Sequence, residues 1–83
     1  MMTKAIVVEG VVARLGDKYW GCQYEDGHST EYGFGPVENA KVSSPKYCQA
    51  PEDMTYREDY QRAELAKAVL VPIRITRIYD VGE

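Results

Sequence analysis

The stretch 15–34 constrains the fold most, because it holds two aromatic-rich segments separated by an Asp-Gly pair. Asp26 and Gly27 between alternating apolar residues predict a β-hairpin, since a type I′ turn needs φ > 0 at both central positions and glycine adopts such angles freely. The predicted strands are 18–25 and 29–34. One face of this hairpin carries the side chains of Trp20, Cys22, Tyr24, Thr30, Tyr32 and Phe34. We expect this face to pack on the core and the opposite face to meet water.

A long β-branched segment precedes the hairpin. Residues 3–14 are apolar at both odd and even positions, which is typical of a central strand with apolar surroundings on both faces. Gly10, in its middle, is the expected place of a bulge or a sharp bend. A turn at Gly16 and Asp17 leads into the hairpin, so the segment 3–34 is predicted to form an antiparallel meander.

An interrupted connector, 35–54, follows the hairpin. Glycine and proline end the preceding strand, and the connector is expected to hold at most a short strand at 40–43. The segment 45–48 is predicted to form a single helical turn, with Ser44 as its cap and proline at its first position. A connector of this length in so small a domain is either functional or packed by its own side chains.

The C-terminal third is predicted to contain one helix and one strand. A Thr-x-x-Glu capping box that starts at residue 55 predicts a helix over 55–68. Alternating Val and Ile residues predict a strand over 69–80. Pro72 has no backbone N–H, which places the strand at a sheet edge or puts Pro72 near the strand's start. The apolar pattern changes phase near residue 77, which indicates a slip or bulge.

Length and composition limit the class of protein. The chain has 83 residues, 45% of them hydrophobic and 28% charged, which suits one small folded domain spanning 1–83. The elements above predict an α+β fold: a bent antiparallel sheet of four or five strands, with the option of closure into a small SH3-like barrel, and one helix before the C-terminal strand. The formal net charge of −3 disfavours a nucleic-acid partner bound through phosphate neutralisation.

The sequence also bears on compartment and on cysteine chemistry. No apolar run reaches the roughly 20 residues that a membrane-spanning helix needs, and the N-terminal residues lack the pattern of a signal peptide. We therefore expect a cytoplasmic protein without a membrane partner. Cys22 and Cys48 could form one disulfide, but in a reducing compartment they are expected to be free, buried thiols.

The segment 19–27, Tyr-Trp-Gly-Cys-Gln-Tyr-Glu-Asp-Gly, lies between a predicted bent strand and a second aromatic strand. This arrangement resembles the central hairpin of small SH3-like barrels of the Tudor kind, whose aromatic rings bind methylated lysine or arginine. The resemblance covers the stretch 15–34, and the predicted helix and the interrupted connector depart from that family. The whole chain is similar to small uncharacterised proteins encoded by bacteria and by their phages or prophages, which implies a phage or mobile-element context.

Aromatic and basic side chains are the candidate binding residues. They are Tyr19, Trp20, Tyr32, Phe34, Arg74 and Arg77. Ring faces attract ammonium and guanidinium groups, so the aromatic members could line a cage for a cation. The alternative is that they pack in the core, with Tyr19 left for a ligand. The two arginines, with Lys41 and Lys46, could form a basic strip, or they could protect an edge strand from pairing.

Cys22, Cys48 and His28 are the sequence candidates for nucleophilic catalysis. A Cys–His pair needs the imidazole within hydrogen-bond reach of sulfur, whereas His28 lies in the predicted turn, where polar residues are expected. One histidine and two cysteines at these spacings match no zinc-binding pattern, and the sequence has no phosphate loop or dinucleotide fingerprint. We therefore expect no catalytic residue, no metal and no cofactor.

The sequence favours a non-catalytic binding module whose partner is another protein. The expected contact surface is the connector together with the acidic residues around the helix start: Glu52, Asp53, Glu58 and Asp59. Two alternatives from other classes stay open. One is a small cysteine-dependent enzyme, and the other is a nucleic-acid-binding barrel that uses aromatic stacking with Arg74 and Arg77. The oligomeric state is left open by the sequence.

Overall fold

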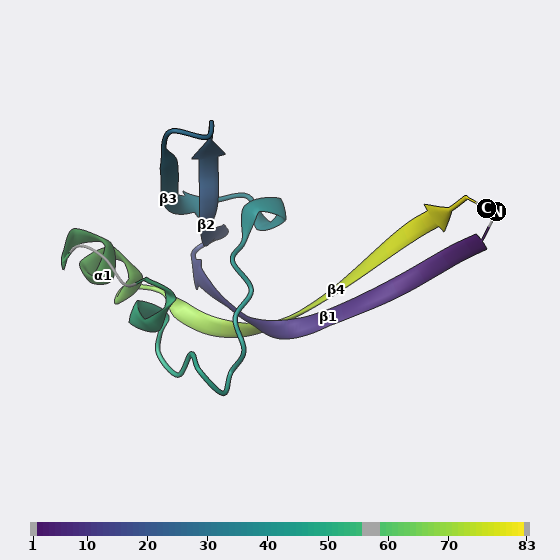
Figure 1. Ribbon diagram of the computed structural model, residues 1–83. Coiled ribbons are helices and arrows are strands. Elements are labelled where there is room, and N and C mark those ends of the chain that lie inside the picture. Colours follow the sequence, from purple (N-terminus) through teal and green to yellow (C-terminus); the bar gives the residue numbers. More distant parts are fainter. Residues whose placement is uncertain (1, 56–58, 83) are drawn as a thin grey trace.

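The computed structural model describes residues 2–55 and 59–82, and these form a four-stranded antiparallel sheet with one α-helix. The strands are β1 (Met2–Leu15), β2 (Lys18–Glu25), β3 (Thr30–Gly35) and β4 (Val69–Val81). Two short 3-10 helices, η1 (Val37–Asn39) and η2 (Pro51–Met54), precede the helix α1 (Asp59–Leu65). The strand order is β3-β2-β1-β4, so β3 and β4 are the open edges of the sheet (Figure 1). The predicted α+β class, with one helix before the C-terminal strand, is confirmed.

β1 and β4 form a long two-stranded ribbon. Each residue of 69–81 lies opposite one residue of 2–14, and the register has no shift. The slip predicted near residue 77 is therefore wrong, and so is a bulge at Gly10. The apolar pattern changes near residue 77 because all the side chains of 76–81 are exposed, so neither face of the strand has to stay apolar.

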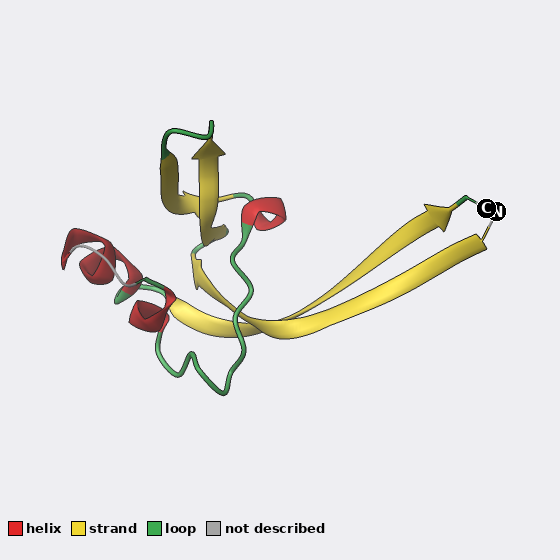
Figure 2. Cartoon of the chain, in the orientation of Figure 1, coloured by secondary structure: helices red, strands yellow, loops and turns green. Residues whose placement is uncertain are grey.

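The outer half of this ribbon projects from the rest of the chain. Figure 1 shows both termini at its far tip, and Figure 2 shows the helical segments lying away from that tip. The Cα radius of gyration is 14.7 Å, with principal extents of 49 × 30 × 23 Å, whereas a compact domain of this length has a radius of about 12 Å. We call residues 2–8 with 75–81 the distal ribbon, and the rest of the described chain the body.

The connector runs between β1 and β2 and replaces their pairing. Within the described sheet, β1 and β2 lie opposite each other only beside their connecting turn. Farther along, the backbone N–H of Lys41 donates to the carbonyl of Trp20 on β2 (2.8 Å), and Ser43 exchanges two hydrogen bonds with Val11 on β1 (2.8 and 2.9 Å). The segment 40–43, expected as a short strand, thus makes two isolated bridges, one to each neighbour.

Gly10 and Gly21 lie where the connector crosses the two strands. A Cβ atom at Gly10 would lie 2.6 Å from the carbonyl oxygen of Ser43. A Cβ atom at Gly21 would overlap the carbonyl oxygen of Asn39 and lie 2.6 Å from its carbonyl carbon. Gly10 therefore permits a close approach of two backbones and does not make the predicted bulge.

The turn between β2 and β3 differs from the predicted type I′ turn. It is a four-residue loop, 26–29, in which Gly27 has a φ of 87° and Asp26 has no positive φ. The carboxylate of Asp26 accepts hydrogen bonds from the backbone N–H groups of His28 and Ser29, both at 2.8 Å. An aspartate that binds its own backbone in this way forms a side-chain turn, which replaces the expected backbone turn.

A register shift between Cys22 and Tyr24 changes the outer end of the hairpin. At its base, Trp20 lies opposite Phe34, and their rings meet edge to face at 5.3 Å. Beyond the shift, Tyr24 is 50% exposed, and Tyr32, which lies opposite Cys22 just before the shift, is 45% exposed. The predicted packed face is therefore correct at the base and wrong at the outer end, because a bulge bends the strand away from the core.

The core is small and lies where the ribbon meets the connector and α1. Its buried cluster comprises Ala13, Trp20, Cys48, Met54, Leu65 and Ala68. The carbonyl of Ser44 accepts hydrogen bonds from the N–H groups of Tyr47 and Cys48, which confirms the predicted turn at 45–48. That turn carries Cys48 into the cluster, so part of the connector is a structural element.

The helix α1 ends at Leu65, inside the predicted range 55–68. Thr55 is buried, and its hydroxyl donates to the side-chain oxygen of Gln61 at 2.8 Å. Glu58, the second member of the predicted capping box, lies outside the described residues. The buried Leu65 anchors this short helix on the core.

Candidate functional site

The distal ribbon exposes six large apolar side chains. They are Met2, Ile6, Val7, Ile78, Tyr79 and Val81, and their exposed fractions run from 41% to 69%. In the segment 3–14, predicted to have apolar surroundings on both faces, only Val12 and Ala13 are buried. That prediction is therefore correct only at the inner end of β1, because nothing in the described chain covers the outer half of the ribbon.

The accessible surface is large for the size of the chain. It measures 6259 Å², whereas a compact folded monomer of 9.4 kDa exposes about 5,000 Å². The difference, about 1,200 Å², is comparable with the roughly 800 Å² that each partner buries in a standard protein–protein interface. A two-stranded ribbon is also marginal in water without a further strand or a covering layer. The distal ribbon therefore has the size and composition of a surface that a partner covers.

The two faces of the distal ribbon differ in chemistry. One face is mainly apolar with two cations, and we call it the apolar face: Met2, Lys4, Ile6, Val8, Ile75, Arg77, Tyr79 and Val81. On the opposite face the hydroxyl of Thr3 donates to the carboxylate of Asp80 at 3.4 Å. At the base of that face, Arg74 forms an ion pair with Glu9 at 2.8 Å. The opposite face also carries Ala5, Val7 and Ile78, so a partner would meet apolar groups on both faces and paired polar groups on one.

The backbone groups on the outer edge of β4 can be assigned from the hydrogen bonds of Val11. Both its N–H and its carbonyl bind Ser43, so they point away from β4. In an antiparallel pair, two opposite residues point their N–H and carbonyl groups either both toward the partner strand or both away from it, and these two cases alternate along the strands. Val11 points away from β4, so Pro72, which lies opposite Val11, points its nitrogen and carbonyl away from β1, toward the outer edge. The same holds for every second residue beyond it: Arg74, Thr76, Ile78 and Asp80. The predicted edge position of β4 is confirmed, and an outward nitrogen explains why proline is tolerated there.

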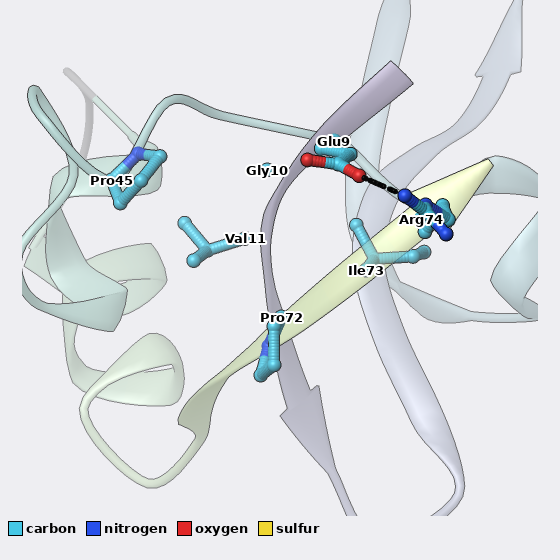
Figure 3. A pocket seen from close by; sticks show the side chains of 7 residues that line it. All are labelled: Glu9, Gly10, Val11, Pro45, Pro72, Ile73 and Arg74. Atoms are coloured by element: carbon cyan, nitrogen blue, oxygen red, sulfur yellow. Dashed lines mark hydrogen bonds and ion pairs between the residues drawn. The ribbon is translucent and has the colours of Figure 1, made fainter. Parts of the chain in front are cut away.

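An open hollow of about 730 Å³ lies at the base of the ribbon, where the connector crosses β1 (Figure 3). Val11, Pro45, Pro72 and Ile73 provide apolar side chains to its lining. The ion pair of Glu9 and Arg74 lies at its other end (Figure 3). The hollow can hold an apolar side chain of a partner that extends along the ribbon.

Of the four aromatic residues predicted to bind a ligand, Trp20 and Tyr32 line one small pocket with Lys41, whereas Tyr19 and Phe34 are not part of its lining. Trp20 is 1% exposed and Phe34 packs against the core, while Tyr19 is half-buried. Tyr32 is exposed, and the ammonium nitrogen of Lys41 lies 5.9 Å from the centre of its ring. The exposed ring therefore already faces a cation of its own chain.

The basic strip expected from four residues is not formed. Arg74 and Arg77 lie three positions apart on β4, so their side chains leave opposite faces of the ribbon. Arg74 is paired with Glu9. Lys41 and Lys46 belong to the connector, where the ammonium of Lys41 donates to a backbone carbonyl at 3.1 Å. These cations thus do not combine into one track for a phosphate backbone.

Both cysteines are free thiols. Burial, followed by the negative charge of Asp53, raises the pKa of Cys48, which is 4% exposed. The thiol of Cys22 points toward a backbone carbonyl at 3.5 Å, and His28 lies in the exposed turn. A raised pKa disfavours the reactive thiolate. Within residues 2–55 and 59–82, no three His, Cys, Asp or Glu side chains lie close enough to hold a metal ion.

Among the acidic residues around the helix start, Asp53 binds backbone groups of the connector. The carboxylate of Asp53 accepts hydrogen bonds from the backbone N–H groups of Gln49 and Ala50, at 3.0 and 3.1 Å. Glu58 and the side chain of Asp59 lie outside the described part. Asp53 therefore holds the chain around η2 in place.

Sequence reasoning missed the distal ribbon as a candidate site. The available signal was strand length, since strands of 14 and 13 residues far exceed the usual five or six, and a chain of 83 residues has little left to cover them. None of the described helices is long and apolar enough to cross a membrane. The chain matches no protein-family model, no curated protein and no solved structure.

Proposed function

We propose that this chain is a non-catalytic protein-interaction module whose binding element is the distal ribbon. The observation that carries the proposal is the group of six large apolar side chains exposed on a ribbon that no other described element covers. Exposed apolar patches of this kind mark sites of protein contact. The partner is a protein that adds a strand to the ribbon or packs on its apolar face.

The charge distribution supports a protein partner over nucleic acid. The whole chain has a formal net charge of −3. On the ribbon, Arg74 is paired with Glu9, and Arg77 lies on the other face. A ribbon that binds a phosphate backbone needs several unpaired cations on one surface. The proposal also includes a cytoplasmic setting, which suits two free cysteines, and a phage or mobile-element origin, which rests on the resemblance alone.

The test compares three forms of the chain as baits in a lysate of the source cells. The first is the wild type, the second carries Ile78→Ser with Tyr79→Ser on the distal ribbon, and the third carries Tyr47→Ser in the connector. Tyr47 is a matched control because it is 78% exposed and lies on the body. We expect the wild type and the control to capture the same protein and the ribbon variant to lose it.

Two results would contradict the proposal. Equal capture by all three forms would remove the ribbon as the binding element, and loss with Tyr47→Ser alone would place the contact on the connector. If an activity screen found turnover of a substrate, and Cys22→Ser or Cys48→Ala abolished that turnover, a catalytic function would replace the proposed binding function.

A further inference from the structure

The outer edge of β4 carries no proline and no bulge along the distal ribbon, where its charged residues are Arg77 and Asp80. Native proteins protect edge strands with proline, charges, bulges or short strand lengths, because free N–H and carbonyl groups recruit another strand. Here proline is confined to the inner end, at Pro72, and 75–81 contains neither a proline nor a register shift. Resting on the proposed binding role of the ribbon, we propose that this edge pairs with the same edge of a second copy. The two ribbons then form one antiparallel sheet in the order β1-β4-β4-β1.

The excess surface of the whole chain leaves room for an interface with a second copy. The chain exposes about 1,200 Å² more than a compact monomer, and a standard interface buries roughly 800 Å² on each side. The same patch on both copies gives a two-fold dimer in which the outer edges of both β4 strands are used. Edge pairing also supplies the third and fourth strands that a marginal two-stranded ribbon lacks.

Among Thr76, Arg77 and Ile78, charge and backbone chemistry favour Ile78 as the position of the two-fold axis. An axis at Arg77 would set the two copies of this arginine directly opposite each other, and like charges in that position destabilise a sheet. An axis at Thr76 would set Asp80 opposite Pro72, which has no N–H for the ladder. An axis at Ile78 avoids both faults, because the ladder covers 75–81 and stops before Pro72.

With the axis at Ile78, the paired side chains are complementary. Arg77 of one copy lies opposite Tyr79 of the other, where a guanidinium can contact the face of a ring. The remaining pairs are Ile75 with Val81, Thr76 with Asp80, and Ile78 with its own copy. The outward backbone groups of Thr76, Ile78 and Asp80 all take part in the ladder, and no two like charges face each other.

The shape of the chain permits this pairing. β4 runs from the body to the tip, where both termini lie (Figure 1). Antiparallel pairing near the tip therefore places the two bodies at opposite ends of the new sheet, where they do not collide. The ladder of seven residues, 75–81, spans about 23 Å, which is less than half of the 49 Å length of the chain.

The first experiment measures mass in solution by light scattering after gel filtration, from low micromolar to sub-millimolar chain concentrations. The expected mass at high concentration is twice the 9.4 kDa of one chain. Ile78→Pro removes one outward N–H and leaves the ladder with β1 intact, so it is expected to give a monomer. Ile78→Val keeps the N–H and the branched side chain, so it is expected to stay a dimer. A urea midpoint equal to that of the wild type at the lowest concentration, where both chains are monomers, shows that both variants fold.

The second experiment tests the register by disulfide trapping in a Cys22→Ser background, with Cys48 left buried. In the proposed sheet the Cα atoms of the two Ile78 residues lie about 5.5 Å apart, within the range of a disulfide. The two Thr76 residues lie four positions apart along the ladder, about 13 Å. Ile78→Cys is therefore expected to cross-link at least about tenfold faster than Thr76→Cys.

A monomeric mass at every concentration would overturn the dimer, and so would a dimer that Ile78→Pro leaves intact. Faster cross-linking through Thr76→Cys would overturn the register. These failures differ from a failure of the proposed function. If the chain is a monomer but its ribbon variant still loses the captured protein, the ribbon remains a binding element for another protein. Equal capture by all three baits would show that the ribbon is not a binding element.

Discussion

Gly21→Ala is expected to destabilise the fold by about 2–4 kcal/mol. The added methyl group would overlap the carbonyl oxygen of Asn39 and lie 3.0 Å from the Cα atom of Ala40, and backbone atoms cannot rotate away as a side chain does. The connector would have to move, which breaks the 2.8 Å hydrogen bond from Lys41 to Trp20. Overpacking usually costs about 1–3 kcal/mol, and a lost hydrogen bond about 0.5–1.5 kcal/mol.

Gly33→Ala is the matched control, because Gly33 lies opposite Gly21 in the β2–β3 pairing. A Cβ atom there would lie 3.9 Å from the side chain of Gln23, which is an ordinary contact. The substitution lowers the entropy of the unfolded chain, so we expect a neutral effect or a gain of up to about 1 kcal/mol.

The assay for both variants is urea unfolding followed by the fluorescence of Trp20, which is the single tryptophan and is buried. Gly21→Ala should also lower the melting temperature by at least about 8 °C. If the free energy of unfolding of Gly21→Ala lay within about 0.5 kcal/mol of the wild type, the insertion of the connector between β1 and β2 would be refuted. Equal losses for both variants would refute it as well.

Three further predictions concern single side chains. Backbone hydrogen bonds lower the pKa of Asp26, so its contribution to stability is present above the ordinary pKa and is lost as pH falls through the lowered value. Asp26→Ala should therefore lower the melting temperature at about pH 7, and the difference from the wild type should shrink as the pH falls below the ordinary pKa. In the folded chain Cys22 should react with a maleimide faster than the buried Cys48, and the two rates should converge in urea. Leu65→Ala should cost about 2–5 kcal/mol in urea unfolding, whereas Tyr60→Ala, at a position 64% exposed, should change stability by less than about 0.5 kcal/mol.

The strands could be predicted from the sequence because their signal is local. Alternating β-branched and aromatic residues predict a strand from its own side chains, so the ranges 18–25 and 69–80 agree with the structure to within a residue. The capped turn at 45–48 was predictable for the same reason, since Ser44 and the following proline act on neighbouring backbone groups. The missing N–H of Pro72 predicted either an edge position for β4 or a place near the strand's start, and the structure shows β4 at the edge.

The candidate site could not be predicted in this way because burial depends on distant parts of the chain. The same alternation occurs in a covered strand and in a bare ribbon, so Ile6 and Ile78 resemble core residues in the sequence although both are exposed. The insertion of the connector depends on Ser43 meeting Val11 across 32 positions, and no local pattern encodes that contact. The turn at Asp26 was mispredicted because a side-chain hydrogen bond competes with the backbone turn that Asp-Gly favours.

Residue-by-residue amide hydrogen exchange along β4 tests the central claim most directly. The N–H groups of Ile75, Arg77 and Tyr79 face β1, so we expect them to be protected at every concentration. Those of Thr76, Ile78 and Asp80 face the outer edge and should gain protection only when a second strand covers that edge. The account predicts that protection at these alternate positions rises with chain concentration. Fast exchange at all three positions under conditions that keep the neighbouring amides protected would show that no second copy binds this edge.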